Sequence, residues 1–252
     1  MLAVWLATGL VAWELAWQCS YQLPGTSWAF AMWGAVPAAA LLLLTRFAAG
    51  FEAWREDFVA FRHRGLGPLA AYVLLWSLLS SMNASVGTPW PYVPLFNPVD
   101  LAQIAVMLAL YCWLRAAAAD DESSPSAQNV LFAALGFVWL NCILLRSIHH
   151  WFGVAYALDD LFNSIVVQSA LSIVWTLTAL VVMVLATRRS QRPLWLAGAA
   201  LLAVVVGKLF LLDLANSGTV ERIVSFLGVG ALLLIIGYAA PVPPGDTETQ
   251  SG

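Results

Sequence analysis

The stretch that decides the fold is "SIVVQSALSIVWTLTALVVMVLATRR", residues 164–189. It is an apolar run without a charged residue until its closing pair of arginines. About 20 apolar residues are enough for a helix to cross a hydrocarbon core roughly 30 Å thick. Arginines at the end of a span mark the cytoplasmic side. We therefore interpret this run as a membrane-spanning helix that runs inward.

Runs of similar length and apolar character occur along the whole chain of 252 residues. Apolar residues make up 62% of it and charged residues 10%, against roughly a quarter charged in a soluble domain. The sequence predicts an all-α, polytopic transmembrane helical bundle of about eight spans, in one domain over residues 1–240. Besides 164–187, the predicted spans are 1–19, 28–46, 68–84, 98–116, 128–149, 194–213 and 221–240.

Positive charges fall on one side of this predicted topology. The chain has 11 lysines and arginines, and most of them lie in loops that share a side if the spans alternate in direction. By the positive-inside rule that side is the cytoplasm, which places both termini there. The arginines concerned are Arg46, Arg55, Arg62, Arg64, Arg115, Arg188, Arg189 and Arg192.

Two segments outside the spans have compositions of their own. Aromatic residues in 51–64 recur at intervals of three and four, which is typical of an amphipathic helix lying on the membrane, here on its cytoplasmic face. The end of the chain, 241–252, is rich in Pro, Gly and polar residues. It predicts a disordered cytoplasmic tail.

The stretch "NPVDLAQ" begins a predicted span with a helix-start pattern. Asn97 suits the capping position, Pro98 the first helical position, and Asp100 the first turn, where the helix dipole favours an anion. We therefore favour a capping role over a functional one for Asp100.

Strongly polar residues of the predicted spans gather in their outer halves. This distribution predicts a polar cavity open to the outside. Side chains in a helix lean toward its N-terminus, so in outward-running spans Glu14, Arg146 and Lys208 lean into the bilayer. Lys208 lies about 9 Å below the end of its span at about 1.5 Å per residue. An unpaired lysine at depth costs about 2.5 to 3.5 kcal/mol, so a buried partner is expected, and an interhelical carboxylate such as Glu14 is favoured over Asp213.

Arg146 shares a helix face with His149 and His150. The two histidines are adjacent, about 100° apart around a helix, which does not suit one metal ion. The three cysteines lack metal or disulfide spacing. We therefore predict no metal and no cofactor. No long basic patch indicates nucleic-acid binding.

Small residues recur every four positions in the span at 194–213, at Ala199, Ala203 and Gly207. Such a stripe lets another helix approach closely. We predict that it contacts either a neighbouring span or a membrane-protein partner.

Three stretches resemble a family of bacterial predicted membrane proteins, domain-of-unknown-function family 2339. They are "GKLFLLDLANSGTVERIVSFLGVGALLLIIGY" at 207–238, "NPVDLAQ" at 97–103 and "LLRSIHHWFG" at 144–153. The resemblance covers the C-terminal part of that family and implies family-pattern positions at Lys208, Asp213, Arg222, Arg146 and His149. Family members are usually longer, with a coiled-coil start and more spans, so we expect either a piece of a longer protein or a reduced member. The family name supplies no activity.

These observations favour a multi-pass protein of the bacterial inner membrane, in contact with membrane lipids. We predict that its outward cavity binds an anionic cell-envelope substrate, whether lipid-linked or not. The predicted role is that of a transferase or processing enzyme. Arg146, Lys208, Arg222 and His150 are the predicted substrate-binding residues. His149, Glu14 and Asp213 are the candidate catalytic residues. Two alternatives stay open: a transporter or flippase, and a non-catalytic scaffold subunit of a membrane assembly.

Overall fold

The computed structural model describes residues 2–48, 61, 64–86, 91–118, 125–209, 230, 234 and 237–238. Within these ranges every regular element is a helix, which confirms that the fold is all-α. In chain order they are α1 (Leu2–Gln22), α2 (Trp28–Ala48), α4 (Gly67–Leu79), the 3-10 turn η2 (Ser80–Met82), α5 (Pro98–Ala118), α6 (Pro125–Phe152), α7 (Leu158–Asn163), α8 (Ile165–Arg188) and α9 (Arg192–Lys208).

Most predicted spans correspond to one of these helices. In the part of the chain that the structure describes, five helices are long and apolar enough to cross a membrane, namely α1, α2, α5, α6 and α8. The predicted span at 68–84 is a shorter apolar helix, Gly67–Met82, and the one at 194–213 is α9, with 17 residues. The predicted span 221–240, apart from four scattered residues, and the tail 241–252 lie outside the described residues, as does most of the predicted interfacial segment 51–64.

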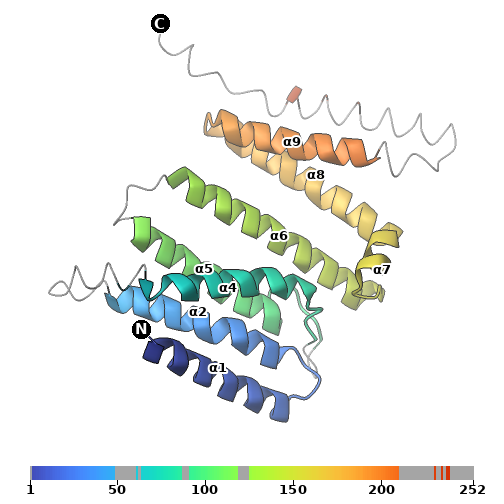
Figure 1. The fold of residues 1–252 in the computed structure, drawn as a ribbon. Coiled ribbons are helices and arrows are strands. Elements are labelled where there is room, and N and C mark those ends of the chain that lie inside the picture. Colours follow the sequence, from blue (N-terminus) through green and yellow to red (C-terminus); the bar gives the residue numbers. More distant parts are fainter. Residues whose placement is uncertain are drawn as a thin grey trace, which may run out of the picture. The chain divides into compact units, whose positions relative to one another are not determined.

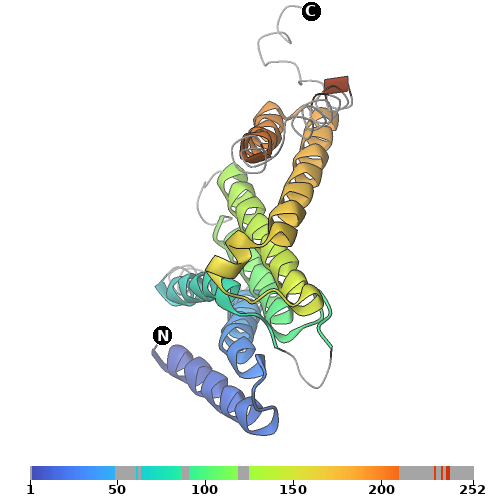
Figure 2. The same ribbon diagram turned by 90° about the vertical axis from the view of Figure 1, so that its right-hand side faces the viewer.

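The chain divides into two compact units, residues 1–161 and 162–252. In the first unit α1 packs on α2, α2 on α5, and α5 on α6, with successive helices side by side (Figure 1). α4 contacts both α2 and α5 and lies on one flank of that row, as the rotated view shows (Figure 2).

The contact between α2 and α5 is made by small side chains. Ala31 and Ala38 on α2 are buried, as are Ala102 and Ala109 on α5. Small residues at such an interface let two helix backbones approach closely, which is how helices associate where lipid removes the hydrophobic drive. This face, which the sequence analysis did not single out, forms the core of the first unit.

α2 contains a proline at a position where a helix would ordinarily lose a hydrogen bond. Pro37 has no N–H, so the carbonyl oxygen of Trp33, four residues earlier, has no partner within the helix. The hydroxyl of Tyr72 on α4 donates to that oxygen at 3.0 Å. Neighbouring helices commonly satisfy backbone groups freed by proline inside membranes. The bond therefore ties α4 to the middle of α2.

In the second unit α8 and α9 pack against each other (Figure 1). They approach closely at Gly198, where an added Cβ would lie 2.7 Å from Cγ of Met183 and 3.1 Å from the carbonyl oxygen of Ala179. Of the predicted small-residue stripe, Ala199 packs against this contact, whereas Ala203 is exposed and a Cβ on Gly207 would meet nothing within 4 Å. The stripe's role as a partner surface stays a prediction.

Candidate functional site

Arg146, which the sequence placed in the outer part of α6, is buried inside the first unit. Its side chain is 1% exposed. Nη1 donates to Oδ1 of Asp100 at 2.6 Å, Nη2 to the carbonyl oxygen of Ser80 at 2.6 Å, and Nε to the carbonyl oxygen of Asn83 at 2.9 Å. One guanidinium thus joins α6 to the start of α5 and to the chain that follows α4.

Asp100, the partner of Arg146, is fully buried. Besides Arg146, its Oδ1 accepts the indole N–H of Trp139 at 3.1 Å. Its Oδ2 accepts the backbone N–H of Leu95 at 3.2 Å and an amide N–H of Asn97 at 2.5 Å. The carboxylate therefore receives four N–H donors.

A charge pair whose two partners are buried needs its other donors and acceptors to be hydrogen-bonded as well. The desolvation penalty is several kcal/mol per ion, and the mutual attraction offsets it only when the remaining donors and acceptors are also matched. Asp100 and Arg146 meet this condition, so the pair is a rigid joint between α5 and α6.

The chain between α4 and α5 is held around this joint by side-chain oxygens. Oδ1 of Asn83 accepts the hydroxyl of Ser27 and the backbone N–H of Ser85, each at 2.8 Å. Ser85 is fully buried, has a φ of 60°, and donates its hydroxyl to Oδ1 of Asn97. That same oxygen accepts the N–H of Asp100 at 3.0 Å, which confirms the predicted cap of α5. We call this set the Arg146 cluster: Ser80, Asn83, Ser85, Asn97, Asp100 and Arg146.

Beyond the cluster, the end of α6 carries the two histidines. Nδ1 of His149 lies 2.7 Å from the carbonyl oxygen of Val154, and Nε2 of His150 lies 2.8 Å from that of Ala84. A carbonyl oxygen only accepts, so these two nitrogens carry the protons. Among the described residues, the other ring nitrogens, Nε2 of His149 and Nδ1 of His150, make no further hydrogen bond. Both residues are half-buried.

Aromatic residues surround the histidines. The ring of Tyr92 stacks on His150 with centroids 4.3 Å apart, and exposed Trp151 meets Tyr92 edge-on. The hydroxyl of Tyr156 donates to the carbonyl oxygen of Ser81 at 2.8 Å. Burial raises the pKa of Tyr92 to about 12 and that of Tyr156 to about 12, so both phenols keep their protons at physiological pH. We call His149, His150, Tyr92, Trp151 and Tyr156 the histidine rim.

The other predicted site residues bond to groups outside the cluster or lie outside the described residues. Glu14 is exposed on α1, where it accepts a hydrogen bond from Gln18, one turn further on, at 2.8 Å. Lys208, in the second unit, donates to the carbonyl oxygen of Gln168 at 2.9 Å and to the hydroxyl of Ser172 at 2.8 Å. Asp213 and Arg222 lie outside the described residues.

Sequence reasoning missed the main partner of Arg146. It assigned Asp100 to capping, whereas Asp100 is in the first turn of α5 and also holds the arginine. A signal was present: Asp100 and Gln103 are three residues apart on the face that continues to buried Val106, so they face the protein interior. Gln103 is indeed buried and bonds to Ser77 and Ser80.

A row of long apolar helices whose buried ionisable groups pair with one another defines a multi-pass helical membrane protein. The chain belongs to the family described as "Predicted membrane protein (DUF2339)", which it matches over residues 1–243. The match confirms the resemblance seen in the sequence and extends it to α1. Neither a curated protein nor a solved structure matches the chain. Among the described residues, no group of three or more His, Cys, Asp or Glu side chains could hold a metal ion.

Proposed function

We propose that this chain resides in the bacterial inner membrane, with its arginine-bearing loops and both termini in the cytoplasm. On its extracytoplasmic side it binds an anionic cell-envelope substrate at the histidine rim. The observation that carries the proposal is the pair of ring nitrogens, on His149 and His150, that remain after each ring has donated to a backbone carbonyl. When either ring is protonated, its second N–H is a charged donor for an anion.

Arg146 has a different role in this proposal from the one its charge predicts. All three donor nitrogens of its guanidinium bind groups of the protein, and the side chain is 1% exposed. It acts as a positioning residue, which fixes the end of α6 three residues before the rim. His149 is the candidate proton carrier if the site performs a transfer or processing reaction, because imidazole serves as both acid and base. Lys208, Arg222, Glu14 and Asp213 stay predicted contributors.

The test is a ligand-induced shift in thermal unfolding of the purified protein in detergent. Farnesyl phosphate, a short anionic prenyl lipid, is the probe, and farnesol is its uncharged control. His149→Asn keeps a donor near Val154, and His150→Gln keeps one near Ala84, while each removes the second ring nitrogen. We expect farnesyl phosphate to raise the midpoint temperature of the unaltered protein and to lose this effect in the double variant. Equal shifts in the double variant, or with farnesol, would contradict the proposal.

The completeness of the Arg146 cluster favours a second candidate function. A charge pair whose partners are all internal serves to orient helices, as in a non-catalytic scaffold subunit. In that case farnesyl phosphate gives no shift, and His149→Asn with His150→Gln leaves the cell envelope unchanged. A cell-envelope defect in that double variant, at normal protein levels, would exclude the scaffold role.

A further inference from the structure

A cavity of about 280 Å³ lies among α1, α2 and α4, away from the histidine rim. Trp5 and Gly9 line it from α1, Trp33 and Pro37 from α2, and Tyr72 from α4. Gly9 is exposed, and a Cβ added there would meet no atom within 4 Å. The cavity is therefore open on the side of Gly9.

Three polar side chains in the lining, on Trp5, Thr8 and Tyr72, are bonded within the protein. The indole N–H of Trp5 donates to the carbonyl oxygen of Gly65 at 2.8 Å, and the hydroxyl of Thr8 to that of Val4 at 2.7 Å. Tyr72 donates to Trp33. A bound water needs two to four polar partners, and this lining offers carbon surface instead. The chemistry of the cavity thus fits a hydrocarbon chain.

The size of the cavity fits one such chain. At about 30 Å³ for each water-sized group, a volume of 280 Å³ holds roughly nine groups. A methylene is similar in size to a water molecule, so the cavity accommodates about half of an acyl chain. α1 and α2 are both long and apolar enough to span a membrane. The exposed side of a spanning helix faces acyl chains.

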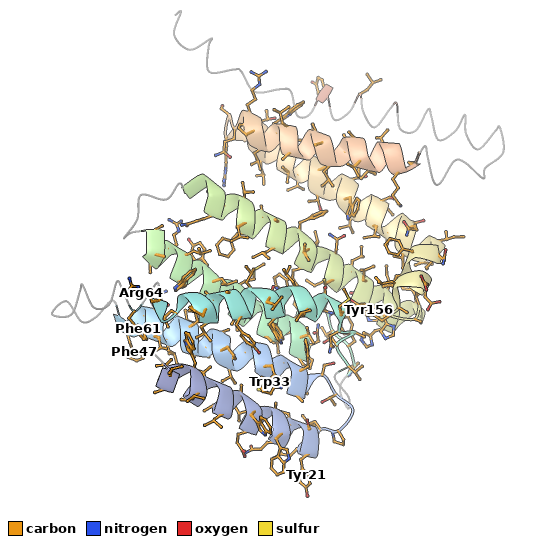
Figure 3. The ribbon with its side chains drawn as sticks, in the orientation of Figure 1. Tyr21, Trp33, Phe47, Phe61, Arg64 and Tyr156 are labelled. Carbon is orange, nitrogen blue, oxygen red and sulfur yellow. The ribbon has the colours of Figure 1, made fainter. Side chains whose placement is uncertain are left out.

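Positive charge marks the end of the first unit where the cavity begins. The carbonyl of Gly65 that binds Trp5 directly follows Arg64, which is exposed. Arg46, also exposed, lies in the last turn of α2. Figure 3 shows Arg64 at this end of the first unit and Tyr156, of the histidine rim, at the opposite end. Arginines at the level of the headgroups attract anionic lipids.

We propose that this cavity binds one acyl chain of an anionic phospholipid, whose phosphate lies at the arginine-bearing end beside Arg64. The site is separate from the histidine rim and uses different residues. It places a lipid against Pro37 and the Tyr72 bond, where α2 and α4 are joined. Lipid composition therefore regulates the stability of the contact between α2 and α4.

Photo-crosslinking tests this site on the full chain in lipid nanodiscs. The probes are phosphatidylglycerol and phosphatidylcholine, each carrying a diazirine on one acyl chain, and labelled peptides are located by mass spectrometry. Phosphatidylglycerol is expected to label the segments around 5–12, 33–37 and 68–72 more than phosphatidylcholine does, by about fivefold for each arginine that contacts the phosphate. Arg64→Gln should reduce this preference.

The matched pair of variants is Gly9→Leu and Gly136→Leu. Both glycines have open space where a Cβ would stand, but Gly9 lines the cavity and Gly136 lies on α6. Gly9→Leu should lower labelling at the three segments several-fold, and Gly136→Leu should leave it unchanged. Even labelling over all the apolar helices, or labelling that survives Gly9→Leu, would overturn the proposal. The rim variants at His149 and His150 should not alter this labelling, and the farnesyl phosphate shift measured in a Gly9→Leu background reports on the rim alone, so the two proposals fail independently.

Discussion

Removing either partner of the Arg146–Asp100 pair should destabilise the protein far more than the loss of an ordinary interhelical hydrogen bond. Asp100→Asn replaces one carboxylate oxygen by an NH2 group, which is a donor. Depending on which oxygen is replaced, this group faces the donors of Arg146 and Trp139 or those of Leu95 and Asn97. Breaking a buried ion pair in this way costs about 3 to 5 kcal/mol. Neutral interhelical bonds in membranes average about 0.6 kcal/mol, so the two cases are separable.

Arg146→Met keeps an unbranched side chain and removes its charge. It leaves Asp100 without a cation and the carbonyl oxygen of Asn83 without a donor, while that of Ser80 keeps only the backbone N–H of Asn83. We expect a similar cost of about 3 to 5 kcal/mol. The double variant loses the same pair only once, so its cost should fall short of the sum by about 2 kcal/mol or more.

The assay is the free energy of unfolding in mixed detergent micelles, followed by tryptophan fluorescence for both single variants and the double variant. Glu14→Gln with Gln18→Ala is the control, since that pair is exposed, and it should change stability by less than about 1 kcal/mol. Single-variant costs near 0.6 kcal/mol, or additivity within about 0.5 kcal/mol, would refute the ion-pair joint.

Two further predictions concern tyrosines. Tyr72→Phe leaves the carbonyl of Trp33 without a donor and should cost about 1 to 3 kcal/mol of unfolding free energy. Adding Pro37→Ala supplies an N–H in α2 and should recover much of that loss. Equal costs with and without Pro37→Ala would contradict the account. Tyr92 and Tyr156 have a raised pKa in the folded state, about 12, against about 10 when unfolded. Their stabilising effect is thus present below pH 10 and lost as the pH rises toward 12. An ultraviolet titration of the folded protein should show late phenol ionisation that diminishes in Tyr156→Phe, and an unchanged titration would exclude its burial.

Hydropathy and length were enough to predict an all-α fold and the five long apolar helices, because a membrane requires a near-continuous apolar run from each span. The run at 98–116 became α5, starting at Pro98 with Asn97 as its cap, as the local pattern predicted. These features depend on neighbours within one turn, which a sequence displays directly.

Partner choice between helices was beyond the same reasoning. Arg146 and Asp100 are 46 positions apart, and their meeting depends on how α5 and α6 pack. The depth argument indicated that Arg146 leans inward, and its side chain is buried, but the argument could not name Asp100 as its partner. The bond between Tyr72 and Trp33 could not be predicted either. Pro37 shows that the carbonyl of Trp33 lacks a donor within the helix, but not which side chain donates to it.

Cysteine accessibility in intact cells tests the central claim most directly, namely that a sealed ion pair supports a water-exposed histidine rim on the extracytoplasmic side. Single cysteines replace His150, Arg64 or Ser147, which is buried beside Arg146, in a background without Cys19, Cys112 and Cys142. A membrane-impermeant maleimide is then applied before and after permeabilisation. The account predicts labelling from outside at position 150, slow labelling at 147 under both conditions, and labelling at 64 after permeabilisation alone. Outside labelling at 64, or equal labelling at 147 and 150, would contradict it.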